Sequence, residues 1–229
     1  MIINDDKNRI ANLKVFIKEW VGTPMPEYGL SEDEVPKNLP NPLREIYLFA
    51  GNWPHPRDND DKYFMPGKQP RIFQEQDCLL GVGNLEMKNG RIVFMVENQR
   101  NWTCEIEENN DASPVYCDAS TLYDATVTGH EIVCESLSHF LVTFCLQELV
   151  MSSEHVGTFV AESEQELVKG DLEPVWLNGL YVFKEPTHSF YICDSKLLIM
   201  KLYDEFWYAC NDESALSLLI KKDSWSKIW

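Results

Sequence analysis

Apolar residues recur at intervals of three and four near the start of the chain, a spacing that is typical of amphipathic helices. The first stripe predicts a helix over 5–21. The second predicts a shorter helix, which Asn41 caps with its side-chain oxygen and which Gly51 ends in a left-handed conformation. Its apolar positions are Leu43, Ile46, Tyr47 and Ala50. Both helices therefore need an apolar surface on which to pack.

Two further helices are predicted later in the chain. The third begins after Ser136, whose hydroxyl is a preferred helix cap, and its apolar residues cover more than one side. Such a helix belongs deep in the fold. The fourth begins after Asn211 or Asp212, either of which can cap it, and extends through Ile220.

Strand patterns fill the stretches between these helices. Asn89-Gly90 stands between two apolar runs, which is a strong hairpin signal, and Asn178-Gly179 repeats it. The run 92–96 is continuously apolar, as in a central strand that is covered on both faces. Three short runs, HSFYIC, LLIMKL and EFWYAC, follow near the end. The order of elements predicts an α+β fold, in which helices pack on a mostly antiparallel sheet.

A half-buried strand is predicted over 102–107, where apolar and polar residues alternate strictly. The polar face carries Glu105 and Glu107, and we expect it to be in contact with water. Glu108 and Asp111 continue this acidic stretch, which contains no basic residue. The sequence therefore predicts an acidic surface on this strand and the turn that follows.

Length and composition favour one acidic domain. The chain has 229 residues, of which 44% are hydrophobic, so it can bury about 70–75% of the surface that it exposes when unfolded. We expect a single domain over 1–229. Seven cysteines without a close pair predict reduced, mostly buried thiols. The formal net charge of −17 argues against nucleic acid or anionic lipid as partner and favours a basic one.

The sequence carries no recognisable export or membrane signal. The stretch MIINDDKNRI lacks the basic start and the apolar core of a signal peptide. The apolar run over 140–151 is too short to cross a bilayer. These features predict a cytoplasmic protein that does not bind membranes.

Several functional motifs are present only in incomplete form. The stretch 81–86 opens like a dinucleotide-binding loop, but Glu86 stands where the third glycine belongs. Asp58 and Asp60 resemble the start of a calcium loop, but Lys62 replaces the third oxygen ligand. The sequence therefore predicts neither a cofactor nor a metal site.

A thiol nucleophile is the remaining catalytic option. Cys134 and His130 would lie one turn apart in a helix, but the preceding Thr128-Gly129 argues against a helix there. His139 is interpreted as a buried or capping histidine of the third helix rather than as a base. We therefore expect no catalytic residues and no enzyme.

Four pieces of the chain, in this order, resemble the SUKH superfamily: LPNPLREIYLFAG, MVENQRNWTCEI, SPVYCDAS and SLSHFLVTFCLQ. The resemblance covers 39–151 best, and 152–229 is either the last part of the same domain or an extension. It implies an α+β fold and a non-catalytic binding module. In bacteria, many such proteins are implied to be immunity proteins, which occlude a cognate secreted toxin domain.

An acidic immunity protein suits a basic toxin, such as a nuclease, because opposite charges speed the encounter. We expect a monomer that binds the toxin domain through acidic side chains, with Trp53 and Tyr63 as aromatic anchors. The candidate partner-binding residues are Trp53, Asp58, Asp60, Asp61, Tyr63, Glu105, Glu107, Glu108 and Asp111. Reversal of the last three to lysine is expected to weaken binding and to leave the fold intact.

Two other classes of function stay open. One is an intracellular regulator or scaffold, the role that the resemblance implies for the fungal cell-wall branch of the superfamily. A long disordered flank would support it. The other is an enzyme with an unrecognised site, which a pocket holding several titratable residues with shifted pKa values would support.

Overall fold

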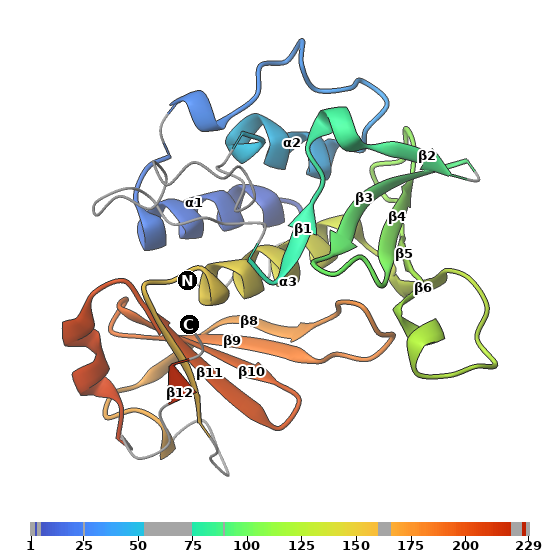
Figure 1. The fold of residues 1–229 in the computed structure, drawn as a ribbon. Coiled ribbons are helices and arrows are strands. Elements are labelled where there is room, and N and C mark those ends of the chain that lie inside the picture. The colour runs from blue at the N-terminus through green and yellow to red at the C-terminus, as the bar shows by residue number, and fades with distance from the viewer. Residues whose placement is uncertain are drawn as a thin grey trace.

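Two antiparallel sheets and a set of helices make up the described structure (Figure 1). The computed structural model describes residues 3, 6–24, 26–52, 75–88, 90–159, 166–220 and 226–227. The first sheet contains β1 (Asp77–Leu79), β2 (Glu86–Lys88), β3 (Arg91–Glu97), β4 (Thr103–Glu107), β5 (Val115–Cys117) and β6 (Glu131–Cys134). The second contains β7 (His155–Phe159), β8 (Leu172–Gly179), β9 (His188–Cys193), β10 (Leu197–Leu202), β11 (Glu205–Cys210) and β12 (Ser226–Lys227). Short 3-10 segments are η1 (Pro26–Tyr28), η3 (Val82–Asn84), η4 (Ala119–Leu122) and η6 (Glu213–Leu218).

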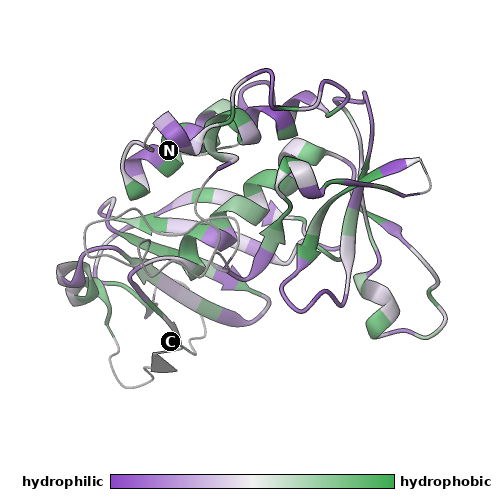
Figure 2. Cartoon of the chain, turned by 45° about the horizontal axis from the view of Figure 1, so that its top comes forward, coloured by the Kyte–Doolittle hydropathy of each residue, from purple (hydrophilic) through white to green (hydrophobic). Residues whose placement is uncertain are grey.

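Helix α3 (Leu137–Met151) lies between the second sheet and the pair formed by α1 (Arg9–Val21) and α2 (Asn41–Ala50) (Figure 1). Every residue from Phe140 to Met151 is buried, as predicted for a helix that is apolar on all sides. Figure 2 shows hydrophobic residues concentrated on this helix and in the strands around it. The largest apolar cluster joins α1, α2 and α3 to both sheets. This arrangement confirms the predicted α+β class.

The first sheet has the order β1-β3-β4-β5-β6, and β2 also pairs with β3. Strand β3 is therefore paired along both edges, and its residues 92–95 are buried. The predicted hairpin is confirmed, since Lys88 of β2 is opposite Arg91 of β3. Gly90 supplies the positive φ of 79° that this turn requires.

The second sheet has the order β12-β7-β11-β10-β9-β8, and the three predicted runs form β9, β10 and β11. The hairpin prediction at Asn178-Gly179 is wrong, because β8 continues through both residues and Gly179 is opposite His188. Asn178 has a φ of 57° at an irregularity in the pairing. A Cβ atom on Gly179 would lie 2.8 Å from Oγ1 of Thr143, so the glycine lets β8 pass close to α3.

The predicted capping interactions at both ends of α2 are also wrong. Asn41 is the first residue of the helix, and its side chain donates to Glu45 at 3.1 Å instead of capping the backbone. Gly51 has a φ of −65°, so it is not left-handed. A Cβ atom at this position would lie 2.6 Å from Cδ1 of Leu30. Gly51 is therefore needed for space rather than for its conformational freedom.

The first and last predicted helices are shorter than expected. Helix α1 begins at Arg9 rather than at Asp5. The last helix is the 3-10 segment η6, and Asp212 caps it by accepting a hydrogen bond from the backbone N–H of Ser214 at 2.9 Å. The cap was therefore predicted correctly, while the length and the type of the helix were not.

Candidate functional site

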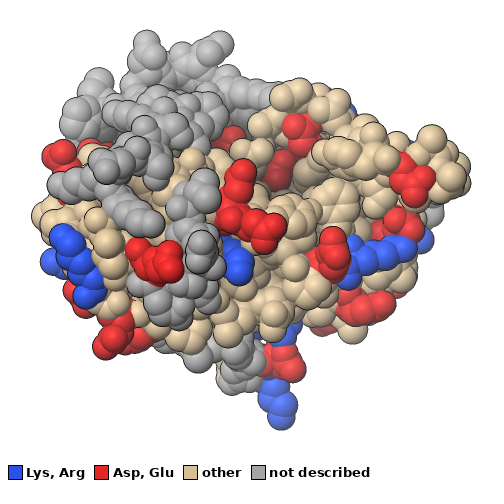
Figure 3. All heavy atoms as spheres, turned by 90° about the horizontal axis from the view of Figure 1, so that it is seen from below, with Lys and Arg blue, Asp and Glu red and all other residues tan. Residues whose placement is uncertain are grey.

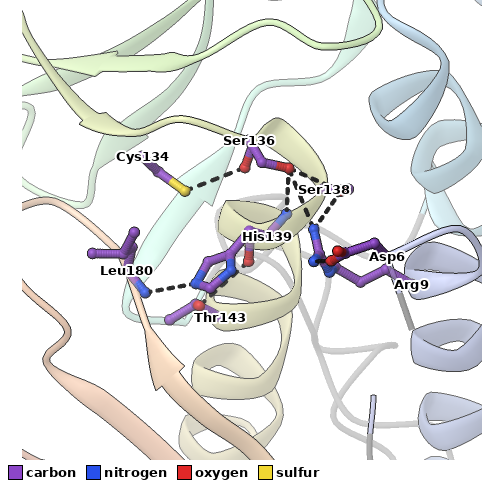
Figure 4. Close-up of polar contacts among 8 residues, drawn as sticks. All are labelled: Asp6, Arg9, Cys134, Ser136, Ser138, His139, Thr143 and Leu180. Atoms are coloured by element: carbon purple, nitrogen blue, oxygen red, sulfur yellow. Dashed lines mark hydrogen bonds and ion pairs between the residues drawn. The ribbon is translucent and has the colours of Figure 1, made fainter. Parts of the chain in front are cut away.

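Polar side chains gather where α1 meets the first turn of α3 (Figure 4). Ser136 caps α3 as predicted, because its Oγ accepts a hydrogen bond from the backbone N–H of His139 at 3.4 Å. Nη1 of Arg9 donates to Oγ of Ser138 at 2.9 Å and to Oγ of Ser136 at 3.3 Å. Asp6 forms an ion pair with the same guanidinium. These contacts fix α1 on the amino-terminal turn of α3.

The histidine and the thiol of this cluster both form hydrogen bonds within the chain. Nε2 of His139 accepts a hydrogen bond from the backbone N–H of Leu180 at 3.0 Å. Burial, with a smaller effect of the charge on Arg9, lowers the pKa of His139 to about 4, so the imidazole is neutral at pH 7. Sγ of Cys134 donates to the carbonyl oxygen of Ser136 at 3.2 Å, and burial raises the pKa of this thiol. The cluster therefore offers neither a free base nor a thiolate.

His130 and Cys134 do not form a thiol–imidazole pair. Cys134 is the last residue of strand β6, and His130 immediately precedes that strand. Four residues of extended chain span about 13 Å, so the side chains are too far apart for proton transfer. The helix that would bring them together is not formed.

A second polar group is centred on Glu148, a fully buried residue of α3. Its carboxyl oxygens accept hydrogen bonds from three successive backbone N–H groups: those of Glu75 at 2.6 Å, Gln76 at 3.0 Å and Asp77 at 3.1 Å. These donors lie at the start of β1, which is the edge of the first sheet. Glu148 therefore joins this edge to the central helix.

The polar group continues from Asp77 toward the second sheet. Oδ2 of Asp77 accepts hydrogen bonds from the hydroxyl of Tyr181 at 2.6 Å and from Nε2 of Gln147 at 3.3 Å. Oε1 of Gln147 lies 2.9 Å from Nε2 of His188, whose Nδ1 lies 2.7 Å from Oγ1 of Thr187. We name Asp77, Gln147, Glu148, Tyr181, Thr187 and His188 the buried polar network.

Every side chain of the buried polar network is 0–8% exposed and bonded within the chain. Burial raises the pKa of Glu148 to about 8 and that of Asp77 to about 6, and it lowers that of His188 to about 4. Shifted pKa values are common at active sites, but they also occur in structural networks. The contacts here connect β1, α3 and β9, which is a structural role.

These pKa values predict how stability depends on pH. The raised pKa of Glu148 means that the folded chain keeps a proton that the unfolded chain releases near its ordinary value of 4.5. His139 and His188 stay neutral in the folded chain but bind protons near pH 6.5 in the unfolded chain, so their shifts raise the free energy of unfolding by about 0.8 kcal/mol in total between pH 6.5 and 8. Glu148 lowers it by about 1.6 kcal/mol over the same window, and Asp77 changes it little. We therefore expect the free energy of unfolding to fall by about 1 kcal/mol between pH 6.5 and 8.

Urea denaturation at a series of pH values measures this dependence. Glu148→Gln, whose amide does not titrate, is expected to lose this fall and to become slightly more stable over the same window, because the two histidines still contribute. An equally steep fall in the variant would assign the dependence to other groups.

The predicted acidic turn lies where the β4–β5 connection meets the loop before α2. The backbone N–H of Asn109 donates to the carbonyl oxygen of Asn38 at 2.8 Å, and Nδ2 of Asn38 donates to Oε2 of Glu108 at 3.1 Å. We name residues 31–38 and 107–111 the acidic surface. Its charged residues are Glu32, Asp33, Glu34, Lys37, Glu107, Glu108 and Asp111.

Two of the predicted partner-binding acids have structural roles. Oδ1 of Asp111 accepts a hydrogen bond from the backbone N–H of Asn41 at 2.6 Å, so Asp111 caps α2. Glu107 accepts hydrogen bonds from Nδ2 of Asn110 and from the hydroxyl of Tyr116, both at 2.8 Å, and these bonds lower its pKa. Charge reversal at these positions would change the fold's stability as well as its surface.

We expect Asp111→Lys to lower the free energy of unfolding by about 1–2 kcal/mol, because it removes a helix cap and places a positive charge at a helix N-terminus. Glu108→Lys is the matched control. Glu108 is exposed, and its loss is expected to change stability by about 0.5 kcal/mol or less. Urea denaturation of the two variants measures the difference, and equal, small losses would contradict the capping role.

Glu105 does not lie on a wet face, so this part of the prediction is wrong. Its side chain is 2% exposed, although it occupies a polar position of the alternating pattern. Its oxygens lie 3.7 Å from Nη1 of Arg91 and 3.3 Å from Nε2 of His130. The Arg91 guanidinium lies over the ring of Tyr116, on the neighbouring strand, with 3.4 Å between its central carbon and the ring centroid. These side chains cover the polar face of β4, so Glu105 is not available to a partner.

The remaining candidate residues for partner binding come from one stretch of the chain. Trp53, Asp58, Asp60, Asp61 and Tyr63 lie outside the described residues. Sequence reasoning also missed the buried polar network. Its signal was Glu148, an ionisable residue within an otherwise apolar helix, because such a residue needs internal hydrogen-bond partners.

No family model, no curated protein and no solved structure matches the chain. The resemblance to the SUKH superfamily therefore stays a prediction. Within the described ranges, no set of three or more His, Cys, Asp and Glu side chains is arranged to hold a metal ion. The helices of these ranges are all too short or too polar to traverse a membrane.

Proposed function

We propose that this chain is a non-catalytic binding protein that neutralises a basic toxin domain by direct contact, in the manner of SUKH-type immunity proteins. The observation that carries the proposal is the acidic surface, in which two segments about 70 residues apart are hydrogen-bonded to each other. A surface that is already fixed before binding loses less entropy when the partner arrives. Lys37 is the one base among its own residues, and Arg44 offsets one further charge through an ion pair with Glu32, so the surface stays negative.

Electrostatics explains why such a surface suits a basic partner. Opposite fields raise the rate of encounter, and an acidic surface can occupy a groove that is built to hold phosphates. On the face shown in Figure 3, acidic side chains are scattered rather than gathered in one place. The wider charge of the chain therefore attracts a basic protein from many directions, and the acidic surface supplies a fixed place for contact.

The test begins with the gene immediately upstream, where we expect a large secreted protein with a variable C-terminal domain. That domain is expressed and purified with and without this chain. Calorimetry is expected to show tight binding in a one-to-one complex, and the toxic activity of the domain is expected to be lost. Absence of binding to this domain would overturn the proposal in favour of a regulator or scaffold.

Charge-reversal variants locate the contact. Asp33→Lys combined with Glu108→Lys is expected to weaken binding about tenfold to a hundredfold, because it reverses two exposed charges of the acidic surface. Glu166→Lys combined with Asp171→Lys makes the same change in net charge at exposed positions elsewhere. Equal weakening by both pairs would show that net charge alone, rather than the acidic surface, governs binding.

A further inference from the structure

Two exposed tyrosines and a half-buried phenylalanine come from the segment after β5 and from the β8–β9 and β10–β11 connections. Tyr123 is 79% exposed and Tyr203 is 51% exposed. The ring of Tyr123 packs edge-on against that of Phe183, with 5.9 Å between the centroids. We name Tyr123, Phe183 and Tyr203 the aromatic patch. In Figure 1 the segment between β5 and β6 approaches the connection between β8 and β9, and the Tyr123–Phe183 contact joins these two segments.

Contacts between the segments hold the aromatic patch in place. The backbone N–H of Tyr203 donates to the carbonyl oxygen of Thr187 at 3.1 Å, which ties the β10–β11 turn to the β8–β9 connection. Lys184 of that connection forms an ion pair with Glu131 at the start of β6. The patch therefore combines residues from three segments that these contacts tie together.

The surroundings of the aromatic patch are acidic. The segments 119–124, 180–187 and 203–205 contain one base, Lys184, and it is already paired. Their acidic residues, all exposed, are Asp124, Glu185, Asp204 and Glu205. An exposed apolar surface within a polar rim is typical of a protein-binding site, and tyrosine is a frequent anchor residue there. The acidic rim selects a partner of positive charge.

We propose that the aromatic patch binds an arginine-bearing segment of a basic protein. A guanidinium is attracted to the face of an aromatic ring, and its donors match the carboxylates of the rim. A second copy of this chain is a poorer occupant, because each copy has a net charge of −17 and the two acidic rims would repel each other. This surface is separate from the acidic surface, so the proposal does not depend on the toxin-neutralising role.

The probe is a short, blocked peptide of alternating arginine and leucine, and its lysine counterpart has the same charge. NMR titration of the full chain at physiological ionic strength is expected to show shifts concentrated in 119–124, 180–187 and 203–205, with tighter binding of the arginine peptide. Tyr123→Ser combined with Tyr203→Asn is expected to weaken this binding about tenfold. Asparagine is chosen because Tyr203 has a φ of 53°, which asparagine tolerates.

Met87→Ser is the matched control, since Met87 is a 56% exposed apolar residue on β2, outside the patch. It is expected to bind the arginine peptide as tightly as the unmodified chain. Shifts spread over exposed carboxylates, equal affinity for the two peptides, or no binding would each overturn the proposal. Concentration-dependent dimerisation that the double variant abolishes, measured by analytical ultracentrifugation, would overturn it in favour of a second copy as occupant.

Discussion

Glu148→Ala is expected to lower the free energy of unfolding by about 3–5 kcal/mol. Alanine removes the acceptor of three backbone N–H groups at the start of β1 and leaves a cavity in place of a fully buried side chain. The cost of one unpaired buried donor is about 1–3 kcal/mol; here the N–H of Asp77 is buried, and those of Glu75 and Gln76 are part-buried. Equilibrium urea denaturation at pH 7 measures the loss.

Two variants make this test specific. Glu148→Gln keeps one acceptor oxygen, but its amide nitrogen cannot accept a hydrogen bond, so it replaces only part of the carboxyl group. It is expected to cost about 1–2 kcal/mol, less than alanine. Glu135→Ala removes an exposed glutamate just before α3 and is expected to have little effect. A small loss in Glu148→Ala would show that β1 does not depend on this carboxyl group.

Gly29→Ala is expected to lower the free energy of unfolding by about 2–3 kcal/mol. A Cβ atom on Gly29 would overlap the backbone oxygen of Leu48, so either α2 or the loop before it must move. The two segments are joined on both sides of this contact, by Leu30 N–H to the carbonyl oxygen of Tyr47 at 3.0 Å and by Asn52 N–H to that of Tyr28 at 2.7 Å. Thermal and urea denaturation measure the loss.

Gly83→Ala is the control for this substitution. No atom lies within 4 Å of a Cβ built at Gly83, and its backbone has no positive φ. Alanine there is expected to be neutral or to stabilise the chain by about 0.4 kcal/mol, because it restricts the unfolded state. If Gly29→Ala and Gly83→Ala have equal free energies of unfolding, the close approach of the loop to α2 does not limit stability. The same approach positions residues 31–38, so Gly29→Ala is also expected to weaken the proposed partner binding.

The buried polar network and the aromatic patch differ in what they offer a partner. The network contains the most strongly shifted carboxylic acids, but its side chains are enclosed and their hydrogen bonds are used internally. The patch carries exposed aromatic rings and is surrounded by acids. Chemistry on a substrate needs reactive groups that a ligand can reach. The network is therefore enclosed, whereas the patch is open to contact with another molecule.

Local patterns in the sequence predicted which elements form better than where each element ends. The cap at Ser136, the turn at Gly90 and the three last long strands depend on neighbouring residues, which the sequence displays directly. The burial of α3 was predicted because apolar residues occur on all sides of this helix. The same reasoning failed at Asn178-Gly179, because the close passage of β8 over α3, rather than a turn, requires that glycine.

By itself, the sequence determined the α+β class, the central buried helix and the acidic character of the chain, because periodicity, caps and charge are properties of nearby residues and of composition. Tertiary structure decided which acids are available. Glu105 is covered by side chains of other strands, Asp111 caps a helix 70 residues away, and Glu148 holds a strand edge more than 70 residues away. The role of a carboxylate depends on the residues that pack against it. Contacts between distant segments produce no repeating pattern in the sequence, so they cannot be read from it.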